Sequence, residues 1–104
     1  MIPEGGADIV RIKEGFILRE LGGESFAVPV GNLVNRFRGM IRLNETGAFY
    51  WKELEKGITR DELVQKMLDR FDGLTEETAR KDLNEFLAGI AFAIDEEEES
   101  FGEQ

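Results

Sequence analysis

Residues 39–51 read GMIRLNETGAFYW, and this stretch decides the fold because it predicts the end of a β region and the start of an α region. Its first five residues alternate in the way that a short strand does, with Gly39 at the start. Asn44 is typical of a helix N-cap, since its side chain can accept a hydrogen bond from an amide two or three residues further on. Apolar residues then recur at helical spacing at Ala48, Trp51 and Leu54.

The chain before this stretch predicts strands and turns. Two short β-favouring runs, at about 16–21 and 25–30, are separated by Gly22 and Gly23, a pair that favours a hairpin turn. Residues 9–12 suggest an extended start, and residues 31–38 suggest a loop or one irregular turn. We therefore expect a third strand at about 39–43.

The chain after this stretch predicts three helices. The first runs from residue 45 to about 56 and is ended by Gly57. Thr59 and Glu62 form a capping box for the second helix, and Thr75 caps the third. The third helix is the most strongly amphipathic, and its expected buried face comprises Ala79, Leu83, Phe86, Leu87, Ile90 and Ile94. The acidic residues from Glu96 onward are expected to be disordered.

These elements predict an α+β fold in the order β-β-β-α-α-α. A three-stranded antiparallel sheet is followed by three helices, and the short turn between the last two helices gives a winged-helix-like arrangement. A chain of 104 residues has the size of one domain. We expect that domain to span residues 9–94, with flexible ends at residues 1–8 and 95–104.

Composition and the lack of targeting segments predict where in the cell the protein acts. The chain has no Cys, which excludes disulfides, thiol catalysis and cysteine-based metal sites. It has no apolar run of about 18 residues or more, so no membrane span is expected. Its first residues lack a basic region followed by an apolar stretch, so no secretory signal is expected. The expected location is the cytoplasm.

The side chains needed for catalysis are scarce. The chain has no His, the side chain best suited to proton transfer near neutral pH. Ser25 and Ser100 are its only serines, so no nucleophile and base pair of a usual form is available. The glycines do not show the spacing of a nucleotide-binding loop. We expect a protein that is not an enzyme, with no cofactor and no bound metal.

The helix-turn-helix order also suggests a DNA-binding function, but the negative net charge of the chain disfavours it. The chain has 22 acidic and 13 basic residues, a net charge of −9, and a nucleic-acid site would have to work against this field. The start of the third helix carries three carboxylates against two cations. Arginines cluster around the third strand instead, at Arg36, Arg38 and Arg42. A winged-helix DNA-binding regulator, or a structural subunit whose acidic face docks on a protein, remains the alternative.

Peptide binding requires neither catalytic side chains nor a basic surface. A strand at a sheet edge exposes backbone groups to which an extended peptide can add. If residues 39–43 form such an edge, the third helix can supply the other wall of a groove, with Leu83, Leu87 and Ile90 as the natural wall residues. Plain core packing is the alternative role for each of these three. Arg42 alternates with its apolar neighbours and should face away from the core.

The stretch 39–51, with GFILRELGGESFAVPVG before it at 15–31, resembles the family of coenzyme PQQ synthesis protein D (PqqD). The resemblance runs from about Val10 to about Ile90, and the LNETG-A-hydrophobic-x-W core is its most specific part. The resemblance implies a recognition element that holds the leader of a ribosomally made precursor peptide and presents it to a modifying enzyme, often a radical SAM protein.

In that family the leader adds as a strand beside the third β-strand and lies against the third helix. The residues that the resemblance assigns to peptide binding are therefore Gly39, Met40, Ile41, Arg42, Leu43, Arg80, Leu83, Asn84, Leu87 and Ile90. One departure lies at the end of the third helix. The family often has a short Gly- and Leu-rich stop there, whereas residues 91–94 of this chain run straight into acidic residues.

Overall fold

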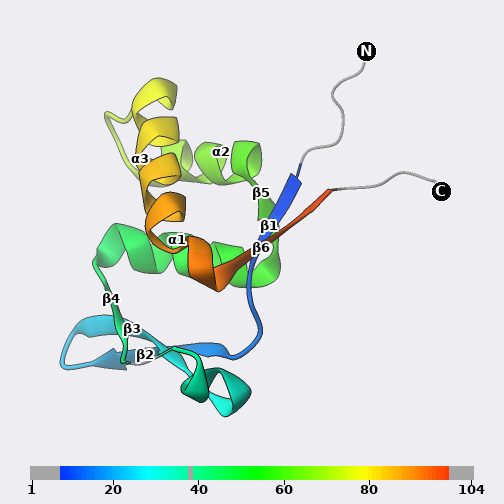
Figure 1. Ribbon diagram of the computed structural model, residues 1–104. Coiled ribbons are helices and arrows are strands. Elements are labelled where there is room, and N and C mark those ends of the chain that lie inside the picture. The colour runs from blue at the N-terminus through cyan, green and yellow to red at the C-terminus, as the bar shows by residue number, and fades with distance from the viewer. Residues whose placement is uncertain (1–7, 38, 99–104) are drawn as a thin grey trace.

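The computed structural model describes residues 8–37 and 39–98, which form an α+β fold with three helices and two three-stranded antiparallel sheets (Figure 1). The elements in chain order are β1 Asp8–Ile12, β2 Phe16–Leu21, β3 Glu24–Pro29, the 3-10 helix η1 Gly31–Asn35, β4 Ile41–Leu43, α1 Glu45–Lys56, β5 Ile58–Thr59, α2 Arg60–Arg70, α3 Glu76–Gly89, the 3-10 helix η2 Ala91–Ala93 and β6 Ile94–Glu98. Over this described part of the chain, no helix is both long and apolar enough to cross a membrane.

The first sheet contains the three strands that the sequence predicts. Its order is β2-β3-β4, and we call it the hairpin sheet. Gly22 and Gly23 make the turn between β2 and β3 with positive φ angles of 60° and 84°, which glycine adopts without the strain that a side chain would bring. The strand β4 pairs with β3 through three residues, with Leu43 opposite Ser25, and forms one edge of the sheet.

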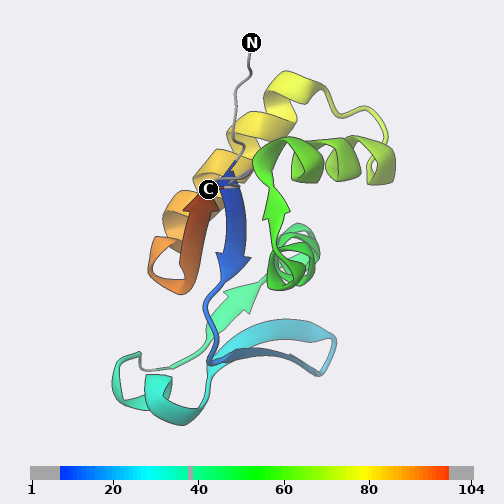
Figure 2. The same ribbon diagram turned by 90° about the vertical axis from the view of Figure 1, so that its right-hand side faces the viewer.

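The second sheet, which we call the terminal sheet, differs from the prediction. Its order is β5-β1-β6, and the five residues of β6 pair with β1 from Ile94 opposite Ile12 to Glu98 opposite Asp8. Figure 2 shows β1 and β6 side by side with α3 behind them. The predicted order β-β-β-α-α-α is therefore incomplete, and the expected disorder from Glu96 onward is wrong for residues 96–98. The winged-helix resemblance stays a prediction.

Pairing with β1 orders this acidic strand, and two ion pairs offset part of its negative charge. Lys13 lies 2.5 Å from the carboxylate of Asp95, and Arg60 donates two hydrogen bonds to the carboxylate of Glu96, at 3.1 and 3.0 Å. Composition alone shows only a run of like charges, whereas the folded chain brings a cation from a distant element to each of these two carboxylates. The expected flexible end at 95–104 thus begins with four residues that are paired with β1, and residues 99–104 lie outside the described part.

The three helices begin where the sequence predicts, because each cap residue makes its hydrogen bond. Asn44 accepts from the amide of Gly47 at 2.7 Å, and Thr59 and Glu62 form the reciprocal capping box. Thr75 accepts from the amide of Thr78 at the start of α3. The predicted extension of α3 to Ile94 is wrong, since the helix ends at Gly89 and the chain passes through η2 into β6.

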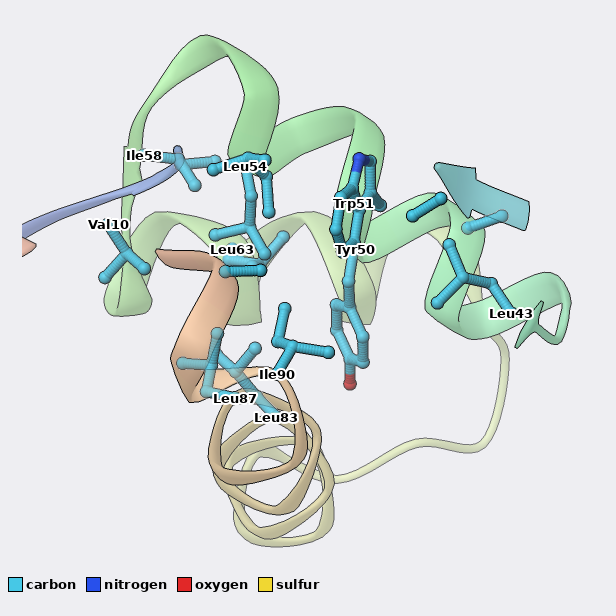
Figure 3. Close-up of a cluster of buried hydrophobic side chains, with 14 of the residues drawn as sticks. Val10, Leu43, Tyr50, Trp51, Leu54, Ile58, Leu63, Leu83, Leu87 and Ile90 are labelled. Atoms are coloured by element: carbon cyan, nitrogen blue, oxygen red, sulfur yellow. The ribbon is translucent and has the colours of Figure 1, made fainter. Parts of the chain in front are cut away.

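The core lies between α1, α2, α3 and the two sheets (Figure 3). Trp51, predicted to be a core residue, is 0% exposed and packs edge to face on Phe16 at 5.9 Å between ring centroids. Its indole N–H is the one buried side-chain polar group in the described residues that has no hydrogen-bond partner. Val34, near the hairpin sheet, is exposed, while Leu33 and Phe37 pack against the core from the same segment.

Candidate functional site: an open strand edge beside α3

The open side of β4 is the first part of the candidate site. One side of β4 pairs with β3, and no strand within residues 8–37 and 39–98 pairs with the other side. Backbone groups alternate between the two sides of an antiparallel strand, so this side carries N–H and C=O groups that an extended peptide can use. Met40, just before the strand, is 56% exposed. The edge therefore has the geometry for strand addition.

Arg42 lies on the outer face of the hairpin sheet, as the sequence predicts. Its side chain is 70% exposed and forms an ion pair with Glu24 of β3. The neighbouring Leu43 points the other way and is only 6% exposed. This alternation means that an added strand would present every second side chain to the inner face. Phe92 of η2 lies near Ile41 on this face, and the middle of α3 lies near Asn44.

A first hollow borders the start of β4. It has a volume of about 260 Å³, and its lining residues include Met40, Ile41 and Phe92 of η2. Phe37 also lines this hollow, and its ring lies 5.3 Å from that of Phe92 and 5.5 Å from that of Phe16. We call it the aromatic hollow. Its rings, together with Arg36, could contact a peptide side chain on the inner face.

A second hollow borders the other end of β4, between the start of α1 and the middle of α3. It has a volume of about 310 Å³ and is lined by Asn44, Tyr50, Asp82, Glu85 and Phe86, among others. We call it the acidic hollow. The Tyr50 hydroxyl donates to the carboxylate of Asp82 at 2.6 Å, and Figure 3 shows that side chain reaching from α1 toward α3. Burial, together with this hydrogen bond and the negative charge of Asp82, raises the pKa of Tyr50 well above its ordinary value.

Gly47 sets the distance between the two helices at the acidic hollow. A Cβ atom on this residue would lie 3.2 Å from the ring of Phe86 and 3.1 Å from the side-chain oxygen of Asn44. Both contacts are tighter than ordinary van der Waals separations. The absence of a side chain at Gly47 therefore allows Phe86 to pack close to the first turn of α1.

The largest hollow lies between the β2–β3 hairpin and α1. Its volume is about 1300 Å³, and it shares Arg42, Leu43 and Asn44 with the candidate site. Its other lining residues come from the hairpin, α1 and the end of α2, and they include several charged side chains of both signs. No part of α3 lines it, so it does not combine a strand edge with the helix that the sequence analysis selected.

The predicted helix residues are distributed differently from the predicted strand residues. Leu83, Leu87 and Ile90 are 1%, 4% and 4% exposed and point into the core, as Figure 3 shows. Arg80 forms ion pairs with Asp61 of α2 at 2.8 Å and with Glu76 at 3.0 Å. The contribution of these residues to peptide binding stays a prediction.

Asn84 is exposed on α3, but it lies on a different flank from the acidic hollow. With 3.6 residues per turn, it is about 200° around the helix from Asp82. None of the hollows that border β4 includes Asn84 or Arg80. The structure thus brings the predicted residues 39–43 together at the edge, while Arg80 and Asn84 lie elsewhere on α3.

Sequence reasoning missed the side chains that line the two hollows, namely Phe37, Tyr50, Asp82, Glu85, Phe86 and Phe92. A signal was present for part of this set. Asp82 and Phe86 are four residues apart on α3 and therefore share one flank. Phe86, expected on the buried face, is half-buried and packs against the core, whereas Asp82 is exposed. No comparable signal relates Phe37 to Phe92, because they come together only in the folded chain.

The fold and the site define a small α+β protein with an open strand edge near the middle of an amphipathic helix, α3, and the 3-10 helix that follows it. Residues 33–91, more than half of the 104-residue chain, match the family described as coenzyme PQQ synthesis protein D (PqqD). The chain belongs to the PqqD family. No curated protein and no solved structure matches the chain.

Proposed function

We propose that this protein is a non-enzymatic peptide-binding adaptor of the cytoplasm. It holds the leader of a ribosomally made precursor peptide as a strand added to β4 and presents it to a modifying enzyme of the radical SAM type. Family membership supports a role in the modification of such a peptide. The observation that carries the proposal is the open edge of β4 with a hollow at each end.

The two hollows lie at opposite ends of β4, so each could receive a different side chain of one bound peptide strand. Residues of a strand that face the same side recur every second position, at about 6.8 Å. The aromatic hollow contacts residues 39–41 and the acidic hollow contacts Asn44. A peptide along β4 would therefore pass both hollows within about five residues, and main-chain pairing would supply an affinity that does not depend on any one side chain.

The hairpin sheet has a second edge, β2, which is the main competitor for strand addition. The strand β2 has six residues and pairs only with β3. It lies beside α1, where Lys52 approaches Glu20 at 3.9 Å. The largest hollow runs along β2 at Leu18 and Glu20, but no residue of α3 lines it. The aromatic hollow reaches β2 only at its first residue, Phe16, and the acidic hollow does not reach it. We therefore place the peptide at β4.

A titration followed by NMR tests the proposal. The probe is a synthetic peptide with the sequence of the leader region of a short open reading frame next to the gene, added to isotope-labelled protein. We expect amide shifts at residues 39–44 and at Phe86 and Phe92, with little change in β2. Slowed hydrogen exchange at alternate amides of β4 would support pairing of the backbone.

The same measurement contains its own controls. A scrambled version of the peptide should give smaller shifts at every position. Shifts confined to β2 would move the site to the other edge of the hairpin sheet. Absence of shifts with every neighbouring short peptide, together with tight binding to promoter DNA, would refute the proposal in favour of the regulator.

A further inference from the structure

The acidic hollow carries charge that the protein does not neutralise. Asp82 and Glu85 line it, and no Lys or Arg is among its lining residues. Neither carboxylate takes part in an ion pair among the described residues. Some acidic side chains on other elements, such as Glu24 and Asp95, are paired with cations. The hollow is therefore a local site of negative charge at the end of β4.

A hydrogen bond from the buried side chain of Tyr50 holds the carboxylate of Asp82 in place. Tyr50 is 1% exposed, and its hydroxyl donates to one oxygen of Asp82 at 2.6 Å. A carboxylate has a second oxygen and further lone pairs, so it can accept other hydrogen bonds at the same time. A buried donor that fixes an exposed carboxylate prepares it for a ligand, because little side-chain freedom is then lost on binding.

Aromatic rings complete the hollow. The ring of Phe86 is half-buried and lies 4.8 Å from that of Tyr50, at a tilt of 41°. An aromatic ring beside carboxylates suits the side chains of Lys and Arg, whose apolar stems pack on the ring while the charged end reaches the oxygens. The rings thus give the hollow a second feature, independent of its charge, that favours a long basic side chain.

We propose that the acidic hollow is a specificity subsite that accepts a Lys or Arg side chain of the peptide strand added to β4. This inference rests on the proposed function, since the strand delivers the side chain. The basic residue is the one that faces the inner side of the sheet at the Leu43–Asn44 end of β4. Asp82 and Glu85 pair with its charged end, and Phe86 contacts its stem. A leader with an acidic residue at this position is rejected.

A positional-scanning library tests this proposal without knowledge of the natural leader. The probes are ten-residue peptides blocked at both ends, in which one position at a time is fixed as Lys, Arg, Gln, norleucine or Glu. NMR first identifies the library members that shift residues 39–44. Dissociation constants for the best of them and for its Gln substitution are then measured at about 0.15 M salt, where surface charges beyond about 8 Å are largely screened.

We expect the Lys or Arg peptide to bind roughly 5- to 20-fold more tightly than its Gln counterpart, the range expected for a charge-assisted hydrogen bond at a partly exposed site. In Asp82→Asn the amide oxygen can still accept from Tyr50, so the fold should persist while the preference falls to about 2-fold or less. Glu85→Gln is a second variant that leaves the Tyr50 hydrogen bond untouched. The preference should fall there too.

Glu77→Gln is the matched control. It removes one negative charge from α3 outside the acidic hollow, so it tests whether the preference arises only from the net charge of −9. Equal losses in Glu77→Gln and Asp82→Asn would overturn the subsite. Peptides that bind at β4 without a basic preference would also overturn it, while the proposed function would stand. If neither a library member nor the neighbouring leader peptide shifts β4, the proposed function and the subsite both fail.

Discussion

Proline substitutions at Ile41 and Arg42 separate the two sides of β4. Neighbouring residues of an antiparallel strand direct their N–H groups to opposite sides, so one of these two amides bonds to β3 and the other faces the open edge. Proline has no N–H. One variant should therefore lose a hydrogen bond of the hairpin sheet, and the other should lose a hydrogen bond to the bound peptide.

The size of each effect follows from one backbone hydrogen bond. Such a bond contributes a net free energy of about 0.5–1.5 kcal/mol. In the variant that keeps the β3–β4 pairing, this loss corresponds to a peptide affinity weakened by about 2- to 12-fold, and the proline ring on the open edge adds to it. In the other variant, the same free energy corresponds to a melting temperature lowered by about 2–12 °C.

Thermal melts and titration with a fluorescently labelled leader peptide measure the two effects. Ile41→Ala and Arg42→Ala are the controls, since both keep the N–H group and should change the affinity much less than proline does. The reasoning is refuted if both proline variants remain folded and bind the peptide as the wild type does. Equal losses in the alanine variants would instead assign the affinity to side chains.

Three further predictions concern the fold that supports the site. Trp51→Ala should lower the free energy of unfolding by about 3–5 kcal/mol, because the side chain is fully buried; a stable variant with weakened peptide binding would instead make Trp51 a ligand contact. Hydrogen bonds from Arg60 hold the pKa of Glu96 below its ordinary value of 4.5, so the pair should stabilise the protein above about pH 4.5 and lose its effect as the pH falls through that lowered pKa. Because both side chains are partly exposed, Glu96→Gln should cost only about 0.5 kcal/mol at pH 7 and progressively less as the pH falls below the lowered pKa, as measured by thermal melts; a difference that does not change with pH would contradict the pairing. Gly47→Ala should destabilise the protein by about 1–2 kcal/mol through contact with the ring beside it, whereas Gly89→Ala, where a Cβ meets no atom within 4 Å, should be neutral or stabilising.

Local chemistry made the ends of most elements predictable. The caps Asn44, Thr59 and Thr75 and the Gly22–Gly23 turn each depend on residues close in sequence. The strand β6 depends instead on contacts far along the chain. Asp95 and Glu96 are ordered because β1 pairs with them, while Lys13 and Arg60 balance their charge. Composition does not reveal these distant partners, and the acidic run alone therefore predicted disorder.

The candidate site shows the same division. The alternation at residues 39–43 predicted a short strand, and β4 lies there at a sheet edge. Helical periodicity identified Leu83 and Leu87 as one face of α3, but periodicity cannot tell a groove wall from the core. Those two side chains are buried, and the flank marked by Asp82 and Phe86 borders the strand edge instead.

The pairing of β1 with β6 has a consequence for protein engineering. Asp8 lies opposite Glu98, so β1 begins beside the end of β6, and Figure 1 shows these two strand ends away from the hairpin sheet. A fusion partner joined directly at residue 8 or at residue 98 would therefore start from nearly the same point, away from the β4 edge. A short loop that joins residues 8 and 98 would allow the chain to be reopened at Gly22–Gly23, giving a circular permutant whose new ends lie in the β2–β3 turn.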